Sequence, residues 1–484
     1  MKLIIPEREM EMTTASLAGG GDLRRLLELQ RRAFAADPLP ARLLRSDRLQ
    51  RLRGMVEKHE AAFAAAIAAD FGGRSRHETL VAEIFVVVAA ANHAIRHLGR
   101  WMRMRSVPTA LYYRPGYNRV LPQPVGVAGI VAPWNYPLQL ALGPAVGALA
   151  AGNRVMLKPS ELTPRLSALL ERVVSENFAA DEFAIVNGGP DTGRAFVELP
   201  FDHLLFTGST AVGRLVAQAA AKNLTPVTLE LGGKSPAIID LSCNFARAAP
   251  RIALGKLLNA GQTCIAPDYA LVPAARVDEF AAALRGAVAT MYPRFVDNDD
   301  YTSIVNDVHY ARLERLLADA KAKGARVVEL GEKADAGRRR LPPALLLGVT
   351  DDMQIMREEI FGPLLPIVGY RGLDEAIAYV ARRERPLSLY WFGEDTANRD
   401  RVLAHTISGG VTVNDCLWHF AQEDLPFGGV GASGIGAYHG EAGFRTFSKE
   451  KPVFFQARHN GMFLMRPPYG RAFERVVALL RRLS

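Results

Sequence analysis

Short apolar runs alternate with longer amphipathic stretches between residues 125 and 231, and this alternation restricts the fold more than any other feature. Residues 125–131 form an almost wholly apolar run, which is typical of a strand buried in a parallel sheet. Similar runs return at residues 154–157, 183–186, 203–206 and 227–231, with helical patterns between them. Since each parallel pair of strands needs a right-handed crossover, we expect a doubly wound α/β domain.

A second α/β region is expected from about residue 235 to the glycine-rich stretch 427–436. The chain has 484 residues, which suits about two to three domains. The remaining segments are shorter: we expect a small hairpin from the aromatic-rich residues 112–121 and 452–456, and a terminal amphipathic helix at residues 473–483.

The N-terminal part of the chain favours helices and shows no export signal. Residues 22–70 contain two helical patterns, the second starting near residue 49 and ending at Gly72 and Gly73, which suit a helix C-cap. Residues 1–21 lack the apolar core of a signal peptide. We find no uninterrupted apolar run long enough to cross a bilayer, so we expect no membrane requirement and a cytoplasmic location.

The charge and cysteine content exclude several functions. The net charge of +9 raises the question of nucleic acid, but the basic residues concentrate only in Arg338–Arg340 and the tail. We interpret Arg338–Arg340 as a solvated surface turn and expect no nucleic-acid partner. The three cysteines cannot all pair and show no Cys-x-x-Cys spacing, so neither a disulfide scaffold nor a metal site is expected.

Cys264 and Glu230 are the residues that suggest covalent catalysis. Cys264 lies in the run 261–267 and Glu230 in the run 229–236. A cysteine thiolate is a strong nucleophile, and a nearby carboxylate can activate the water that releases an acylated enzyme. A lone cysteine is more often a small buried apolar residue, so this interpretation depends on the rest of the chain.

A nucleotide site is predicted where a strand meets a helix at residues 206–213. The free N–H groups of such a helix attract a pyrophosphate. The glycine spacing is neither Gly-x-Gly-x-x-Gly nor a complete phosphate loop, because Arg214 and Leu215 stand where Lys and Ser or Thr are required. Lys158 and Glu161 follow another strand, where they can contact ribose hydroxyls.

Five separated motifs together resemble the aldehyde dehydrogenase superfamily over nearly the whole chain: residues 133–137, 158–164, 206–213, 229–236 with 261–264, and 358–363. The resemblance is closest to the compact, dimeric class that includes bacterial coniferyl aldehyde dehydrogenases. It implies two doubly wound α/β domains with a small β-hairpin oligomerisation arm. The implied parts are an NAD-binding domain (1–107 and 123–232), a catalytic domain (233–428), the arm (108–122 and 429–460) and a tail helix (461–484).

The resemblance also implies a reaction. Cys264 would attack the aldehyde, and Asn135 with the Cys264 backbone N–H would stabilise the resulting oxyanion. Hydride transfer to a nicotinamide would leave a thioester, which water activated by Glu230 would hydrolyse. Nine residues match the family's cofactor contacts and imply NAD, with NADP possible: Trp134, Lys158, Ser160, Glu161, Gly208, Ser209, Leu231, Glu359 and Phe361.

The aldehyde is less constrained by the sequence. Residues near the implied substrate funnel include several aromatic ones, which suit a flat, apolar substrate such as coniferyl aldehyde: Tyr136, Ile265, Trp418, His419 and Phe420. A medium- or long-chain aliphatic aldehyde is the alternative. The arm implies a homodimer, and a tetramer stays open.

Three other functions compete with this interpretation. Transfer of the thioester to coenzyme A is disfavoured by Glu230, because relatives with that activity usually lack a base there. A cysteine hydrolase needs a histidine directed at Cys264, and no sequence motif identifies such a histidine. An inactive binding protein on the same fold is disfavoured by the presence of Cys264, Glu230 and Asn135.

Overall fold

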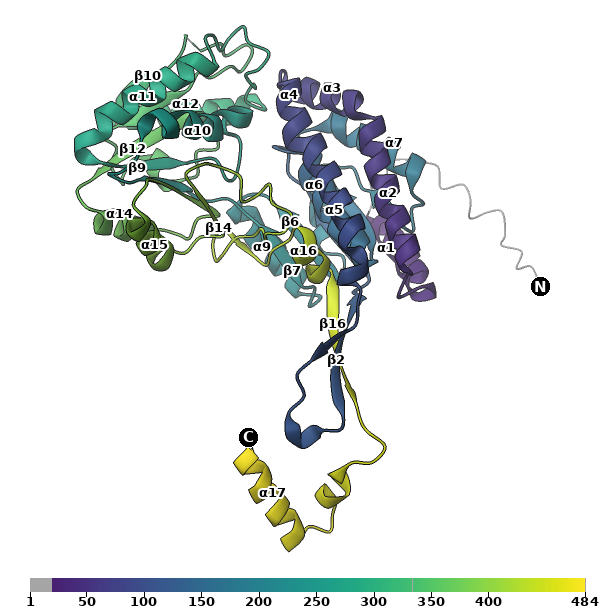
Figure 1. Ribbon diagram of the computed structural model, residues 1–484. Coiled ribbons are helices and arrows are strands. Elements are labelled where there is room, and N and C mark those ends of the chain that lie inside the picture. The colour runs from purple at the N-terminus through teal and green to yellow at the C-terminus, as the bar shows by residue number, and fades with distance from the viewer. Residues whose placement is uncertain (1–19, 333, 484) are drawn as a thin grey trace.

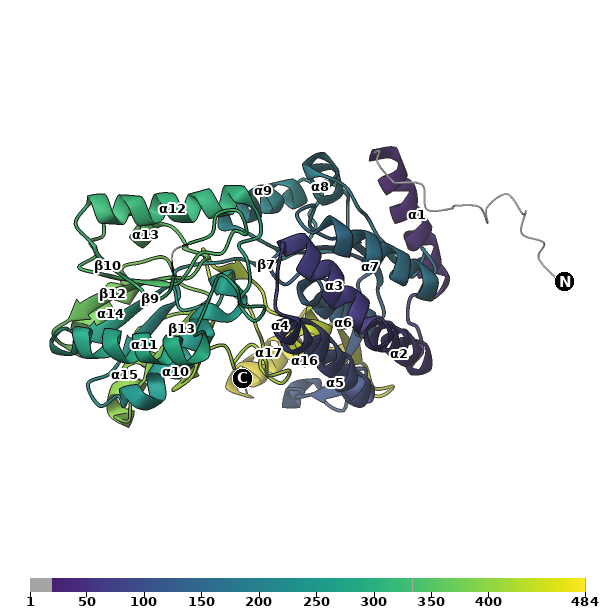
Figure 2. The same cartoon turned by 90° about the horizontal axis from the view of Figure 1, so that it is seen from above.

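Three β-sheets organise the protein, whose structure is a computed structural model that describes residues 20–332 and 334–483. Two α/β units lie side by side in both views, and an arm extends away from them (Figures 1 and 2). This architecture confirms the predicted α/β fold with two parallel sheets. The domain limits given above stay predictions.

The first sheet has six strands in the order β15-β7-β6-β3-β4-β5. All neighbours pair in parallel except β15, which is antiparallel to β7. From β3 the chain builds outward first through β4 and β5 and then through β6 and β7, so the topological switch point lies between β3 and β6. A ligand crevice is expected at the carboxyl ends of these two strands. The strands are β3 (Val127–Val131), β4 (Arg154–Lys158), β5 (Phe183–Ile185), β6 (His203–Thr207), β7 (Val227–Glu230) and β15 (Gly434–Ile435).

Alternate residues of this sheet enter two different hydrophobic clusters, as the two-residue period of a strand requires. Ala128 and Ile130 pack with one helical layer, whereas Val127 packs with the other. Both faces are thus covered, which explains the almost wholly apolar strands. The first layer contains α2 (Arg42–Lys58), α3 (Glu60–Phe71), α5 (Val86–Trp101), α6 (Gln139–Ala151), α7 (Pro164–Asn177) and α16 (Gly440–Thr446); the second contains α1 (Gly20–Ala36), α8 (Pro190–Val197) and α9 (Thr210–Ala221).

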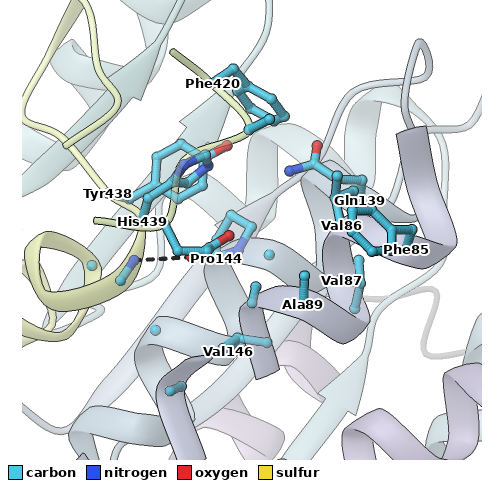
Figure 3. A pocket seen from close by; sticks show the side chains of 18 of the residues that line it. Phe85, Val86, Val87, Ala89, Gln139, Pro144, Val146, Phe420, Tyr438 and His439 are labelled. Atoms are coloured by element: carbon cyan, nitrogen blue, oxygen red, sulfur yellow. Dashed lines mark hydrogen bonds between the residues drawn. The ribbon is translucent and has the colours of Figure 1, made fainter. Parts of the chain in front are cut away.

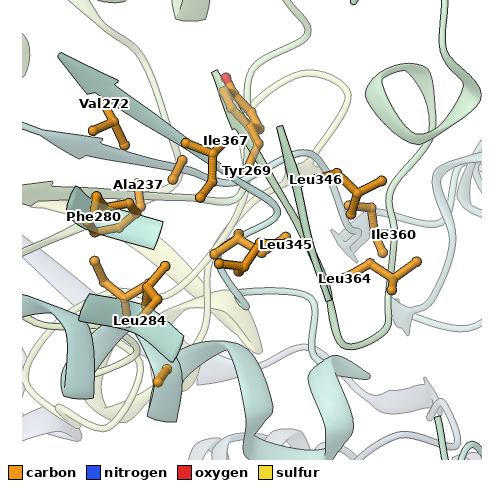
Figure 4. Packing of buried hydrophobic residues seen from close by; sticks show 14 of the residues in the cluster. Ala237, Tyr269, Val272, Phe280, Leu284, Leu345, Leu346, Ile360, Leu364 and Ile367 are labelled. Atoms are coloured by element: carbon orange, nitrogen blue, oxygen red, sulfur yellow. The ribbon is translucent and has the colours of Figure 1, made fainter. Parts of the chain in front are cut away.

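The second sheet has seven strands in the order β10-β11-β12-β9-β8-β13-β14, with only β10 antiparallel to its neighbour. Its hydrophobic core includes Tyr269 and Leu346 from two of the strands and Phe280 from a covering helix (Figure 4). The strands are β8 (Pro236–Ile239), β9 (Tyr269–Pro273), β10 (Arg326–Glu329), β11 (Ala344–Leu347), β12 (Leu364–Tyr370), β13 (Ser388–Phe392) and β14 (Gly410–Val413). The helices are α10 (Phe245–Leu257), α11 (Val277–Met291), α12 (Asp307–Ala322), α13 (Gln354–Arg357), α14 (Leu373–Ala381) and α15 (Thr396–His405), with short 3₁₀ turns η4 (Leu258–Gly261) and η5 (Ala274–Arg276).

The arm is a three-stranded antiparallel sheet in the order β1-β2-β16 (Figure 1). It consists of β1 (Arg105–Val107), β2 (Tyr117–Pro124) and β16 (Ser448–Phe455). The expected pairing of two aromatic-rich segments is therefore present, although Tyr112 and Tyr113 lie in a 3₁₀ turn, η3 (Leu111–Tyr113), rather than in a strand. Beyond the arm, η6 (Gly461–Met465) leads to the tail helix α17 (Arg471–Leu483).

One expectation for the N-terminal helices was wrong. The single helix expected from residue 49 to Gly72 is α2 and α3, separated at His59, whose φ of −107° and ψ of 16° interrupt the helix. The continuous helical segment Arg76–Trp101 is long and apolar enough, by length and composition, to cross a membrane. It comprises α4 (Arg76–Thr79), a π-helical turn η2 (Leu80–Phe85) and α5. Since α5 packs against α2 and α6, we interpret it as a core helix.

The expectation that Arg338–Arg340 form a solvated turn was also wrong for two of the three arginines. Arg339 donates hydrogen bonds to the carbonyls of Phe71 and Ile304, both at 2.8 Å. Arg340 is buried and donates to the Asn298 carbonyl at 2.7 Å. These guanidinium groups therefore hold loops together, because their donors match carbonyl oxygens that would otherwise lie unpaired.

Candidate active site

A cleft of about 810 Å³ opens at the carboxyl ends of β3, β6 and β7, where the strand order predicts a ligand site. Segments of the second α/β unit close its other side. Nine of the site residues predicted from the sequence line it: Trp134, Asn135, Gly208, Ser209, Glu230, Leu231, Cys264, Glu359 and Phe361. Residues that are far apart in the chain are thus brought to one place.

Cys264 is presented by a strained turn that follows α10. Asn259, Ala260 and Gly261 have successive φ values of 55°, 52° and 75°, in the left-handed region that costs roughly 1–2 kcal/mol for each residue with a Cβ. A Cβ on Gly261 would lie 2.3 Å from the Gly362 carbonyl oxygen, so only glycine fits there. Strain of this kind collects at functional sites, where the surrounding structure must hold it.

A buried polar network holds this turn against the loop that carries Asn135. The Asn259 side-chain nitrogen donates to the carbonyls of Asn135 at 2.9 Å and of Gln262 at 3.1 Å. The Asn135 side-chain nitrogen also donates to the Gln262 carbonyl, at 3.2 Å. An amide nitrogen carries two hydrogens, so Asn135 keeps one donor for an oxyanion formed on Cys264.

Charged residues that the sequence analysis missed stabilise the same network. Arg74 donates to the Glu83 carboxylate at 2.8 Å and to the Asn135 carbonyl at 3.0 Å. Glu83 also accepts from the first N–H groups of α6, and Glu78 accepts from the Asn259 N–H. All three side chains are buried, and removing one partner of such a pair typically costs about 3–5 kcal/mol. Glu83 was visible in the sequence as a charge inside the apolar run 80–88, whereas Arg74 lies in the loop before α4 and has no such signal.

Glu230 ends β7 and is buried with neither carboxylate oxygen hydrogen-bonded within the described residues. Burial raises the pKa of this carboxyl well above its usual value. An unpaired buried carboxyl is costly for stability, and a perturbed pKa in a cleft is typical of an acid–base group. The position therefore fits the water-activating role that the resemblance implies.

Two acidic side chains lie near the Cys264 thiol, which also packs against a hydrophobic cluster. Burial, with the nearby Glu359 and Glu230 carboxyls, raises the pKa of Cys264 to about 12. The thiol is therefore protonated at neutral pH, and the reaction needs a base to remove its proton. Within the described residues no histidine hydrogen-bonds to Cys264, which disfavours a cysteine hydrolase.

The N-terminus of α9 lines the cleft where the sequence predicts a pyrophosphate. Ser209 is its N-cap, and its hydroxyl accepts from the Val212 N–H at 3.4 Å. Gly208 follows β6 directly, and a Cβ there would lie 2.5 Å from the Phe206 ring. The backbone can thus come close to a bound phosphate.

Three further predicted residues lie at the carboxyl end of β4, which Lys158 ends and Ser160 and Glu161 follow. The Lys158 ammonium donates to the Glu161 carboxylate at 3.0 Å and to the Pro159 carbonyl at 3.1 Å. Ser160 is buried and its hydroxyl accepts from the Leu162 N–H at 3.2 Å. Because β4 neighbours β3, this ion pair lies along the edge at which the cleft opens.

Glu359 and Phe361 occupy the opposite wall. The Glu359 carboxylate lies directly over Gly232, where a Cβ would approach within 2.0 Å of it. Burial and the nearby Asp268 raise the pKa of Glu359 to about 8. The Phe361 ring is perpendicular to the Trp134 ring, with centroids 5.4 Å apart.

Two cations that the sequence analysis did not assign hold this wall in place. Lys234 pairs with Asp268 and donates to the carbonyls of Ile355 at 2.7 Å and Glu358 at 3.0 Å. Arg312 donates to the Glu359 carbonyl at 3.1 Å. Such contacts depend on the tertiary structure, and a single lysine or arginine in the sequence does not reveal them.

The predicted substrate residues lie outside this cleft. The Tyr136 hydroxyl hydrogen-bonds to the Thr263 hydroxyl at 2.7 Å, and the Ile265 carbonyl accepts from Tyr390. His419 is buried, with one ring nitrogen on Ser388 at 3.0 Å and the other on Thr412 at 2.7 Å, whereas Trp418 is 54% exposed. In this arrangement His419 has no free nitrogen for a substrate, and the substrate roles stay predictions.

Comparison with known proteins decides the family. The model of the aldehyde dehydrogenase family matches residues 1–453. The chain belongs to that family. It is 51% identical to a probable coniferyl aldehyde dehydrogenase of Pseudomonas aeruginosa over 455 residues, which are 94% of this chain and 95% of the relative.

Solved structures of aldehyde dehydrogenases have the same fold. The substrate-bound state of Staphylococcus aureus AldH has a TM-score of 0.90 and 39% identity, covering 95% of this chain and 99% of that one. A Mycobacterium tuberculosis aldehyde dehydrogenase complexed with NAD⁺ has a TM-score of 0.82 and 29% identity, covering 91% of both chains. The present dehydrogenase is therefore an NAD(P)-dependent oxidoreductase that converts aldehydes into acids.

The cleft of the dehydrogenase fits a nicotinamide dinucleotide. It offers a helix N-terminus at Ser209 for the pyrophosphate and the Glu359 carboxyl for ribose hydroxyls. Gly208 and Gly232 leave no Cβ between the backbone and the groups that line the cleft. The same cleft contains Cys264, so a dinucleotide bound there would lie beside this thiol.

Proposed function

We propose that this dehydrogenase oxidises aromatic aldehydes such as coniferyl aldehyde, bound in a second pocket beside the cleft. The pocket lies between α5, α6 and the segment 420–440. In Figure 3 Tyr438 and His439 face Gln139 and Val86 across it, with Phe420 at one end. Aromatic walls favour a flat ring through stacking and burial of apolar area.

The Tyr438 side chain is the observation that carries this proposal. It lines the pocket, and burial together with the nearby Glu230 and Cys264 groups raises the pKa of its hydroxyl well above the usual value. Tyr438 also belongs to the hydrophobic cluster against which Cys264 and Phe420 pack. A ring held in this pocket can therefore direct its aldehyde group toward the thiol. The Pseudomonas aeruginosa relative, whose name includes coniferyl aldehyde, supports the same substrate class.

The reaction proposed for these residues uses three of them directly. After Glu230 takes the thiol proton, Cys264 sulfur bonds to the aldehyde carbon, and the oxyanion accepts hydrogen bonds from Asn135 and the Cys264 N–H. NAD, when bound, supplies the acceptor for the hydride that leaves this carbon. Glu230 then releases the thiol proton to solvent and deprotonates a water, whose oxygen attacks the thioester carbon. The carbon–sulfur bond breaks, the carboxylic acid leaves, and Glu230 returns the proton to the Cys264 sulfur.

The alternative substrate is a medium- or long-chain aliphatic aldehyde, favoured by the aliphatic side chains that α5 contributes to the pocket, among them Val86 and Val87. The deciding experiment measures NADH formation by the purified enzyme with coniferyl aldehyde, cinnamaldehyde, hexanal and decanal. We expect higher kcat/KM for the aromatic pair. Higher values for the aliphatic pair would replace the proposal with the alternative, and no NADH from any aldehyde would favour an inactive binding protein.

We expect the affinity for NAD to rise with pH through about 8. Glu359 ionises there, and an ionised carboxylate accepts ribose hydroxyl bonds about 1 kcal/mol better than a neutral one, or about fivefold in Kd. Calorimetric titration of the Cys264→Ala variant between pH 6.5 and 9 checks this without interference from the thiol. Glu359→Gln should abolish the pH dependence; an unchanged slope in that variant would assign it to another group.

Lys158 and Glu161 support a preference for NAD over NADP. Their ion pair places a carboxylate where the adenosine ribose is expected, and a carboxylate repels a 2′-phosphate. Lys158 attracts the same phosphate, so the preference is moderate and NADP is also accepted. A cytoplasmic location, which cell fractionation tests, stays a proposal from the sequence.

A homodimer is proposed through the arm, where β16 has an unpaired edge and several exposed aromatic side chains. Phe454 and Phe455 are 45% and 37% exposed, and Phe455 stacks on Tyr117. We expect sedimentation to give twice the chain mass of 52.8 kDa, and Phe455→Asp to give the monomer because a buried carboxylate is costly. A dimer that persists in Phe455→Asp, with unchanged thermal stability, would place the interface elsewhere; a fourfold mass would indicate a tetramer.

A further inference from the structure

The pocket proposed for the aldehyde contains one acidic side chain among its described lining residues, Glu423. Glu423 accepts a hydrogen bond from the Gly440 N–H at 3.3 Å. Burial raises the pKa of Glu423 to about 7. A carboxyl can accept several hydrogen bonds, so a half-buried one with a single long bond has capacity for another partner.

His439 is a second polar group on the same wall with an unused atom. It is 9% exposed, and its Nδ1 has no hydrogen-bond partner within the described residues. Burial lowers the pKa of His439 to about 3, so the ring is neutral. Because Gly440 follows His439 and donates to Glu423, the chain itself places these two polar groups next to each other.

These polar groups lie within reach of a molecule that reacts at Cys264. Tyr438 belongs to the hydrophobic cluster against which Cys264 packs, and burial with the nearby Glu230, Cys264 and Glu423 groups raises the pKa of its hydroxyl. Tyr438 and His439 are consecutive and both line the pocket, in which most other side chains are apolar. A substrate that fills the pocket therefore meets apolar surface along its body and a hydrogen-bonding group on one wall.

We propose that Glu423 binds a hydroxyl group on the aromatic ring of the substrate, so that the enzyme selects phenolic aryl aldehydes over unsubstituted ones. This inference rests on the proposed aromatic function and adds a specificity-determining residue to it. An ionised Glu423 accepts a bond from the phenol, and a protonated one donates to the phenol oxygen. A site built to bond a hydroxyl discriminates strongly against a substrate without it, because its own polar groups then stay unpaired.

The test compares two substrates that differ in ring hydroxylation, coniferyl aldehyde and cinnamaldehyde, in wild type and variants. Glu423→Leu should lower kcat/KM for coniferyl aldehyde by about 10- to 100-fold, as loss of a charged hydrogen bond predicts, and should leave cinnamaldehyde within about twofold. Glu423→Gln, which keeps hydrogen-bonding atoms, should lose less. Asp424→Leu is the matched control: it removes the neighbouring carboxylate, which is 81% exposed and does not line the pocket, and should change neither substrate.

Two results would overturn the inference while leaving the aromatic function intact: equal losses for both aldehydes in Glu423→Leu, or no loss for coniferyl aldehyde. The wild-type enzyme tests the aromatic function separately. If it oxidises hexanal and neither aryl aldehyde, the aromatic function is wrong, and the role proposed for Glu423 is wrong with it. If Glu423→Leu does not fold, as judged by its thermal transition, the comparison is made with Glu423→Gln. An identical coniferyl-to-cinnamaldehyde ratio in Glu423→Gln and wild type then counts against the inference.

Discussion

Cys264→Ala should abolish aldehyde oxidation, with a fall in kcat of at least about 10⁴-fold. The sulfur forms the covalent bond on which both later steps depend, and removing a nucleophile of this kind costs several orders of magnitude. The measurement is steady-state NADH formation with coniferyl aldehyde and hexanal at saturating NAD. The cleft keeps its helix N-terminus at Ser209 and its Glu359 carboxyl, so the variant should still bind NAD.

Retained NAD binding is the control that separates lost chemistry from lost structure. Cys243→Ala is the matched variant, because Cys243 is buried in the core of the second unit and does not line the cleft. It should lower thermal stability without removing turnover. Steady activity near the wild-type value in Cys264→Ala would show that another group attacks the aldehyde.

Glu230→Gln should slow steady turnover by about 10²- to 10⁴-fold, the usual contribution of a general base. Glutamine has nearly the same shape but cannot take a proton from the thiol or from water. Raising the pH toward about 10 increases the small ionised fraction of the thiol, so we expect one equivalent of NADH per active site that forms faster as the pH rises, followed by slow release of the acid. Stopped-flow absorbance with NAD and aldehyde in excess measures both phases.

The burst and the steady rate report different steps. A burst with slow turnover assigns Glu230 to hydrolysis of the thioester, whereas loss of both at every pH assigns its main role to thiol activation. Acid formation at the full rate would contradict either role. Adding coenzyme A to the variant tests the competing transfer reaction, which would restore turnover without a base.

The fold, and the meeting of Glu230 and Cys264 in one cleft, could be predicted from the sequence because their signals are local. Apolar strands followed by helices determine the parallel sheet. The short sequence motifs around Glu230 and Cys264 can be recognised without knowledge of the fold. Residue 59 shows where this fails: an Ala-rich amphipathic pattern continues through the break between α2 and α3, so periodicity alone gives one helix.

The substrate side depended on contacts that no local pattern contains. His419 follows Trp418 in an aromatic run that suggests a binding wall, but its two ring nitrogens bond to Ser388 and Thr412 in the core. Glu423 looks like a surface residue beside Asp424, and only the fold brings it to a pocket with His439. Burial of a polar side chain is decided by segments far along the chain, which a short motif cannot record.

The strained turn before Cys264 limits how this enzyme can be recombined with its relatives. Asn259 is held by Glu78 and by the Asn135 carbonyl, both of which come from the first α/β unit, although the turn itself belongs to the second. Neither unit alone therefore contains all the residues that hold the turn before Cys264. A chimera cut between the two sheets inherits a working thiol only if the segments around Glu78, Asn135 and Asn259 come from the same parent.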